Sequence, residues 1–106
     1  MPTLVIHAPR WKAQQENAQS FERTFNSGIG EGYAIYRNLF ANLFPGCGVV
    51  LLSKDEKRRA EGTLIRLVPT EMTNNGIQRY DVHIRNLIEV EYRPERLNHC
   101  GVAVIL

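Results

Sequence analysis

Hydrophobic positions recur at strand spacing and then at helical spacing in the N-terminal half of the chain. Residues 3–7 form a short β-branched run before Ala8-Pro9, which predicts a first strand. Residues 10–25 place apolar side chains on one face of a predicted helix: Trp11, Ala18, Phe21 and Phe25. Residues 33–44 predict a second helix that Pro45-Gly46 ends, with one apolar row formed by Tyr36, Phe40 and Phe44.

The pattern changes to strands in the second half of the chain. Apolar runs at residues 48–52 and 63–68 flank a polar connection, so they predict a hairpin with a long charged tip. Pro69 is expected to end the second strand of that hairpin. Asn75-Gly76 is a strong signal for the next tight turn. Residues 102–106 predict a last strand, so the first and last elements are both strands.

Residues 80–92 alternate apolar and polar side chains, which is typical of a strand with one buried face. The odd positions carry polar groups, among them His83 and Arg85. Asn86-Leu87 interrupts the alternation and predicts a bulge or a short turn. The even positions are expected to face the core: Tyr80, Val82, Ile84, Ile88, Val90 and Tyr92.

The order of the elements predicts the fold class. The 106 residues suit a single domain that covers residues 1–106. Because most strands follow one another directly, antiparallel pairing is favoured over a doubly wound parallel sheet. We therefore predict an α+β domain, a small and strongly bent, mostly antiparallel β-barrel with two early helices.

Charge and composition narrow the classes of protein. The net charge is +2, which disfavours a purely electrostatic nucleic-acid binder but allows a domain that reads one base in a pocket. Cys47 and Cys100 lack metal-ligand spacing, so we expect free thiols, no metal and no cofactor. The apolar start stops at Pro9, too early for a signal peptide, and no run approaches the roughly 20 residues that span a bilayer. These features predict a cytoplasmic protein without membrane contact.

Residues 26–33, NSGIGEGY, form a glycine-rich stretch whose function is open. Its spacing matches neither a dinucleotide-binding loop nor a P-loop, and a predicted helix precedes it. One interpretation is a flexible connection between the two helices. The other is the rim of a pocket, where Ser27, Gly28 and Gly30 let a flat ligand approach the backbone.

Two aromatic side chains are candidates for stacking on a base. Trp11 follows the first strand and either anchors the first helix in the core or forms the wall of a base pocket. Tyr33 is the better ligand candidate of the nearby tyrosines because it adjoins Gly32. Tyr36 lies on the apolar row and is expected in the core.

The tip of the charged hairpin carries a surplus of positive charge at Lys57, Arg58 and Arg59. A solvated tip is the simplest interpretation, since charge runs are usually exposed. The alternative is contact with phosphates, which would position a nucleic acid without reading its sequence. Arg79 and His83 would then extend this contact surface.

Catalytic patterns are weak. His7, His83 and His99 lack metal-binding spacing, and the neighbours His99 and Cys100 do not form a dyad merely by adjacency. Glu31 in the glycine stretch or Glu61 near the hairpin tip could act as a general acid or base. We predict no catalytic residue from these patterns.

Four stretches resemble the PUA-like superfamily, most closely its EVE, YTH and ASCH branches: HAPRW, FPGCGVVLL, AEGTLIRLV and RYDVHIRNLIEVEYRP. The resemblance implies a bent β-barrel with helices on one side. EVE and YTH members hold a modified base between the barrel and the early helix–loop region. By position, that pocket would involve Trp11 and residues 27–33 of this chain.

These observations lead to three hypotheses. The first is a module that binds DNA or RNA and recognises a modified or flipped base in an aromatic pocket. A small nucleoside or amide hydrolase of ASCH type, with Lys12, Glu31 or His83 as acid–base groups, is the second. The third is a protein-interaction or oligomerisation module that uses the row Tyr36, Phe40 and Phe44. The predicted nucleic-acid contacts are Trp11, Lys12, Ser27, Gly28, Gly30, Tyr33, Lys57, Arg58, Arg59, Arg79 and His83.

Overall fold

The computed structural model describes residues 1–8, 20–98 and 101–106, and in these residues six strands and two helices follow one another. They are β1 (Thr3–Ala8), α1 (Phe21–Ser27), β2 (Ile29–Ala34), α2 (Arg37–Phe40), β3 (Gly48–Ser53), β4 (Arg59–Met72), β5 (Gln78–Val90) and β6 (Val102–Ile105). The strands form one sheet in the order β2-β5-β4-β3-β1-β6.

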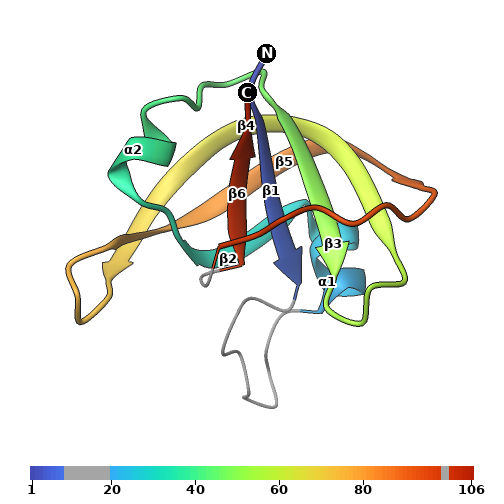
Figure 1. Ribbon diagram of the computed structural model, residues 1–106, viewed down its shortest axis with the longest axis horizontal. Coiled ribbons are helices and arrows are strands. Elements are labelled where there is room, and N and C mark those ends of the chain that lie inside the picture. The colour runs from blue at the N-terminus through green and yellow to red at the C-terminus, as the bar shows by residue number, and fades with distance from the viewer. Residues whose placement is uncertain (9–19, 99–100) are drawn as a thin grey trace.

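Antiparallel pairing dominates the sheet, as predicted. The exception is the parallel pair of β1 and β3, whose connection contains α1, β2 and α2. The first and last strands pair antiparallel, so the two ends of the chain lie together (Figure 1). The coarser part of the predicted fold class is confirmed: the domain is a small, mostly antiparallel, strongly curled sheet with two helices.

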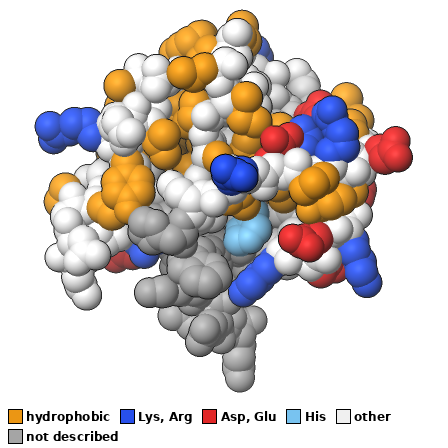
Figure 2. All heavy atoms as spheres, in the orientation of Figure 1, with side chains coloured by type: hydrophobic (Ala, Val, Ile, Leu, Met, Phe, Trp, Pro, Cys, Tyr) orange, Lys and Arg blue, Asp and Glu red, His pale blue; other side chains and the backbone are white. Residues whose placement is uncertain are grey.

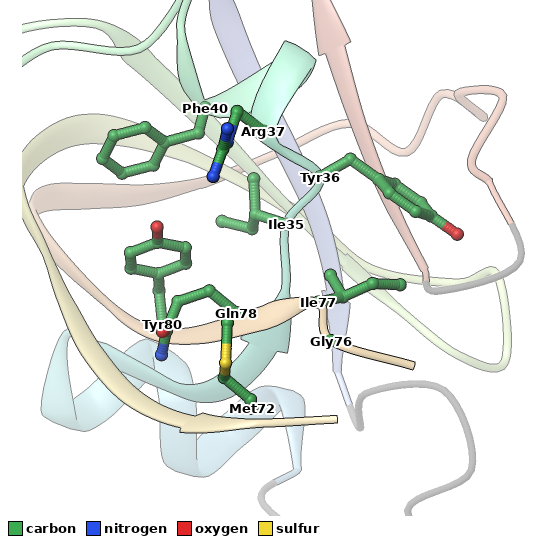
Figure 3. Close-up of a pocket in the computed structure, with 9 residues that line it drawn as sticks. All are labelled: Ile35, Tyr36, Arg37, Phe40, Met72, Gly76, Ile77, Gln78 and Tyr80. Atoms are coloured by element: carbon green, nitrogen blue, oxygen red, sulfur yellow. The ribbon is translucent and has the colours of Figure 1, made fainter. Parts of the chain in front are cut away.

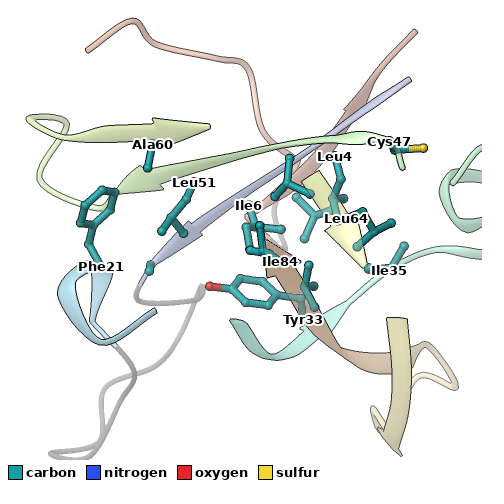
Figure 4. Close-up of a cluster of buried hydrophobic side chains, with 14 residues drawn as sticks. Leu4, Ile6, Phe21, Tyr33, Ile35, Cys47, Leu51, Ala60, Leu64 and Ile84 are labelled. Atoms are coloured by element: carbon teal, nitrogen blue, oxygen red, sulfur yellow. The ribbon is translucent and has the colours of Figure 1, made fainter. Parts of the chain in front are cut away.

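The curl comes from the long strands β4 and β5, of 14 and 13 residues, which arch across the sheet (Figure 1). Their concave side encloses the main core, with β1 contributing alternate residues Leu4, Ile6 and Ala8 (Figure 4). Phe21 of α1 packs on this core near the ends of β1 and β3. β1, α1, β4 and β5 therefore all contribute to one apolar core.

The opposite face of β1 and β3 carries a second apolar cluster. Val5, Val50 and Leu52 point to this side and are covered by Tyr92 and Leu97 from the connection between β5 and β6. Because β1 and β3 are buried on both faces, their sequences read as continuous apolar runs rather than as alternations.

Two strand features differ from the sequence prediction. β4 does not end at Pro69 but continues to Met72. Pro69 lies opposite Tyr80, next to a register irregularity, and such an irregularity accommodates a residue without an N–H donor. The turn at Asn75-Gly76 is confirmed: the N–H of Gly76 bonds the Thr73 carbonyl at 3.0 Å.

The bulge at Asn86-Leu87 is confirmed as well. Glu61 pairs with Ile88 and Thr63 with Arg85, so β5 holds one extra residue there, and Asn86 has φ 57°. An extra residue reverses the side-chain alternation beyond it. The prediction that Ile88 faces the core is therefore wrong: Ile88 is 65 % exposed, and Leu87 packs on the core instead.

The glycine-rich stretch is not a flexible connection between helices. It forms β2, which pairs antiparallel with β5 through Ile29 with His83 and Gly30 with Val82. The missing side chains are needed for this close packing: a Cβ on Gly30 would lie 2.9 Å from the Tyr33 ring. The long-range pairing with β5 overrides the weak strand propensity of glycine.

The second predicted helix is much shorter than expected. α2 is one turn, Arg37–Phe40, and the chain then turns through residues 41–46 toward β3. Its one turn does not lay the apolar row on the core, so Phe40 is 39 % and Phe44 is 47 % exposed. Most of the first predicted helix lies outside the described residues, whereas its end is α1, capped by Ser20. In the described part of the chain, no helix has the length and apolar character to cross a membrane.

Candidate ligand-binding groove

A groove of about 670 Å³ opens between α2 and the tip of the β4–β5 hairpin, and we name it the α2 groove. Its size falls within the roughly 300–1,000 Å³ typical of small-ligand sites. β2 leads directly into it, because the N–H of Ile35 bonds the Gln78 carbonyl at 3.2 Å and ties the two walls together. Its lining consists of Ile35, Tyr36, Arg37, Phe40, Met72, Gly76, Ile77, Gln78 and Tyr80.

A stacked aromatic pair dominates the groove. The rings of Phe40 and Tyr80 lie 4.9 Å apart at 17°, one from α2 and one from β5. Figure 3 shows the two rings facing each other, with Arg37 beside Phe40. Tyr80 is partly buried against the core, which fixes the position of the pair, while Phe40 stays open to solvent. The pair therefore offers a rigid and partly exposed aromatic surface.

The polar groups of the groove complement that surface. Arg37 is exposed, and its guanidinium pairs with no other residue in the described ranges. The Gln78 amide nitrogen donates to the carbonyls of Glu71 and Arg79, which leaves its Oε1 as an acceptor. Among the described residues, no carboxylate lines the groove. The site thus combines flat apolar walls with a cation and one oriented acceptor, and it favours a planar, anionic ligand.

Most of the predicted contacts in the glycine stretch serve the fold. Gly28 caps α1 at φ 72°, with its N–H bonded to the Thr24 carbonyl at 2.9 Å. The Ser27 hydroxyl accepts the Ile29 N–H at 3.1 Å. Gly30 is buried in β2. The backbone of this stretch is therefore bonded within the domain.

Tyr33 is a core residue, not the wall of a pocket. It is only 2 % exposed, and its hydroxyl donates to the His7 carbonyl at 2.9 Å. Figure 4 shows the ring among the buried apolar side chains. Arg79 also acts within the fold, since it donates to the Gly32 carbonyl at 2.8 Å. His83 lies half-buried on the outer face of β5, paired with Ile29.

Two of the three basic residues at the hairpin tip are held by carboxylates. Arg58 bonds Glu89 at 2.8 Å and Glu22 at 2.6 Å, and the hydrogen bond to Glu89 lowers the pKa of the Glu89 carboxyl. Arg59 is 3 % exposed and engages two further carboxylates. Lys57 is exposed. Positive and negative side chains also intermingle on the right of the face in Figure 2 rather than forming a basic patch.

Several predicted residues lie outside the described ranges: Trp11, Lys12, His99 and Cys100. Of the acid–base candidates, Glu31 forms an ion pair with Arg23 at 3.7 Å. Cys47 is buried and forms no disulfide. No group of three or more potential metal ligands occurs among residues 1–8, 20–98 and 101–106. This placement gives the hydrolase hypothesis no support.

Sequence reasoning missed the central pair of the α2 groove. It placed Phe40 on an apolar helical row, in the core or at an interface, and Tyr80 on the buried face of a strand. The two rings meet because β2 pairs with β5 and leads into α2. The exposed Asn-Gly turn between β4 and β5 was the only local signal for one end of the groove, and it carried no information about the other wall.

Comparisons with known proteins assign neither a family nor a related fold. No protein-family model matches the chain, and no curated protein or solved structure matches it. The resemblance to the PUA-like superfamily therefore stays a prediction.

Proposed function

We propose that this domain binds single-stranded nucleic acid and holds one base in the α2 groove. The observation that carries the proposal is the partly exposed stacked pair of Phe40 and Tyr80 beside Arg37, which forms no ion pair within the described ranges. An aromatic surface stacks on any base and contributes roughly 1–3 kcal/mol per base. A guanidinium donates to phosphate or to a base edge, and the Gln78 Oε1 accepts from an exocyclic amino group.

The proposal includes membership in the PUA-like superfamily and recognition of a modified or flipped base. The curled, mostly antiparallel sheet with two helices is compatible with the architecture that the resemblance implies. The aromatic pocket is now proposed at the α2 groove, because Tyr33 and the glycine stretch are engaged in the fold. A base modified by a methyl group would gain apolar contact with Ile77.

Few phosphate contacts are expected, since Arg58 and Arg59 are held by carboxylates. The logarithm of the binding constant falls with the logarithm of salt concentration by about 0.7 for each phosphate contacted on a single strand. The salt dependence of this domain should therefore be shallow. Stacking, rather than charge, should dominate the affinity.

The test is a fluorescence anisotropy titration with short DNA and RNA homopolymers, plain and methylated, at about 50 and about 200 mM salt. Phe40→Ala should weaken binding by about tenfold. Arg37→Gln should weaken it less and should reduce the salt dependence. Ile88→Ala and Arg96→Gln are matched controls, since both side chains are exposed and outside the groove. A folded wild type that binds no oligonucleotide contradicts the proposal, as does unchanged binding by Phe40→Ala.

Self-association is a second candidate, because the apolar row is exposed at Phe40 and Phe44 instead of buried. A second copy that covered this row would remove both side chains from water. Light scattering over a range of protein concentrations tests for self-association. A monomer at every concentration contradicts self-association, and a dimer that Phe44→Ala dissociates supports it.

A further inference from the structure

We propose, as an extension that rests on the proposed function, that the domain takes two consecutive nucleotides and holds the second base in a neighbouring groove. This Phe44 groove has a volume of about 220 Å³. Phe40 lines it as well as the α2 groove, so the two sites have a common aromatic wall. The other lining residues come from the α2–β3 connection and from β4: Leu43, Phe44, Pro45, Leu64, Arg66 and Leu67.

The size of the Phe44 groove limits its occupant to one small group. Its volume is below the roughly 300 Å³ at which sites for drug-sized ligands begin. Apart from Arg66, the lining side chains named above are apolar, and Phe44 is 47 % exposed. A single base that stacks on an exposed ring fits this description, whereas a complete second nucleotide would leave its sugar and phosphate outside.

Charge indicates where those phosphates would lie. Arg66 lines the Phe44 groove, is exposed, and forms no ion pair within the described part of the chain. Arg37 has the same properties in the α2 groove. As far as residues 1–8, 20–98 and 101–106 show, neither lining contains a carboxylate. Each groove thus combines an exposed aromatic ring with one available guanidinium, which is the repeat expected for successive nucleotides of a polyanion.

The test compares ligands of increasing length by NMR titration: a nucleoside monophosphate, the matching dinucleotide and a longer homopolymer. The dinucleotide should bind the wild type about tenfold more tightly than the mononucleotide. Phe44→Ala and Arg66→Gln should remove that difference and leave the affinity for the mononucleotide unchanged. Phe44→Leu keeps the apolar volume and should lose most of the gain, since it lacks a ring. Arg96→Gln should change neither affinity.

Equal affinity of the wild type for the mononucleotide and the dinucleotide would overturn the second subsite. So would a Phe44→Ala variant that keeps the gain, which is the outcome expected if the Phe44 groove takes an apolar side chain of a protein. These results differ from failure of the proposed function, in which neither the mononucleotide nor the homopolymer binds. Circular dichroism of each variant separates lost binding from lost folding.

Discussion

The Tyr33 hydroxyl donates a hydrogen bond of 2.9 Å to the backbone carbonyl of His7, across the core from β2 to the end of β1. These two strands are not neighbours in the sheet, since β5, β4 and β3 stand between them. The bond therefore fastens the two sides of the curled sheet to each other. It gives a polar role to a residue that the sequence assigned to ligand binding.

Removal of this hydroxyl should destabilise the domain. Tyr33→Phe leaves the His7 carbonyl without its donor and should lower the free energy of unfolding by about 0.5–1.5 kcal/mol. Urea unfolding measures the difference. Tyr80→Phe is the control, because the Tyr80 hydroxyl bonds no other residue in the described ranges. Equal stability of Tyr33→Phe and the wild type would show that the bond contributes nothing.

Gly28 should tolerate a side chain less well than Gly76. Both have left-handed φ angles, 72° and 80°. A Cβ on Gly28 would also lie 2.8 Å from the Ile84 carbonyl oxygen, whereas the space around Gly76 is open. Gly76→Ala should cost about 1 kcal/mol from backbone strain alone, and Gly28→Ala about 1–3 kcal/mol more. Thermal unfolding measures the loss of stability in each variant, and the difference between them is the cost of the contact with the Ile84 carbonyl. Equal losses of stability would contradict that cost.

The glycine stretch also shows why part of the fold could be predicted and part could not. β3, the Asn75-Gly76 turn and the bulge at Asn86 follow from local signals: an apolar run, a turn dipeptide and a break in alternation. β2 lacks such a signal, because its glycines favour no strand. It is a strand because β5 offers hydrogen-bond partners for its backbone.

The candidate site was less predictable than the fold. Stacking residues were expected in the chain, but the sequence could not tell which aromatic side chains would be covered. Tyr33 is buried since β2 lies against the core, and Phe40 is exposed since α2 ends after one turn. The arginines pose the same difficulty, because Arg59 and Arg66 look alike in sequence. The connection between β5 and β6, which supplies Glu95, covers Arg59, whereas Arg66 lines the Phe44 groove.

The bond between the buried Arg59 and Glu95 should stabilise the domain by holding the connection between β5 and β6 in place. Its guanidinium bonds Glu95 at 2.8 Å, Glu61 at 3.0 Å and the Arg93 carbonyl at 3.0 Å. Glu95→Gln removes the charge of one partner and should cost about 1–3 kcal/mol. Glu91→Gln, an exposed carboxylate in the same segment, should change stability by no more than about 0.5 kcal/mol. Chemical denaturation measures both, and equal effects would mean that the bond is unimportant.

His7 should make the domain less stable in mild acid. Burial, together with the positive charge of Lys54, lowers the pKa of His7 below its ordinary value of about 6.5. Its Nδ1 is buried without a hydrogen-bond partner in the described structure. Between the lowered pKa and about 6.5, the unfolded chain binds a proton that the folded chain does not. Above this window, His7 is neutral in both the folded and the unfolded chain, so its titration costs no stability. The free energy of unfolding should therefore fall as the pH drops through the window.

The measurement for His7 is urea unfolding at about pH 7.5 and about pH 5.5, above the range where most carboxylates titrate. His7→Gln should remove most of the loss in acid, because glutamine binds no proton in this range. His83→Gln is the control and should keep the loss, since it leaves His7 and Lys54 in place. If His7→Gln loses as much stability as the wild type between the two pH values, another group causes the effect, and burial of neutral His7 is not its origin.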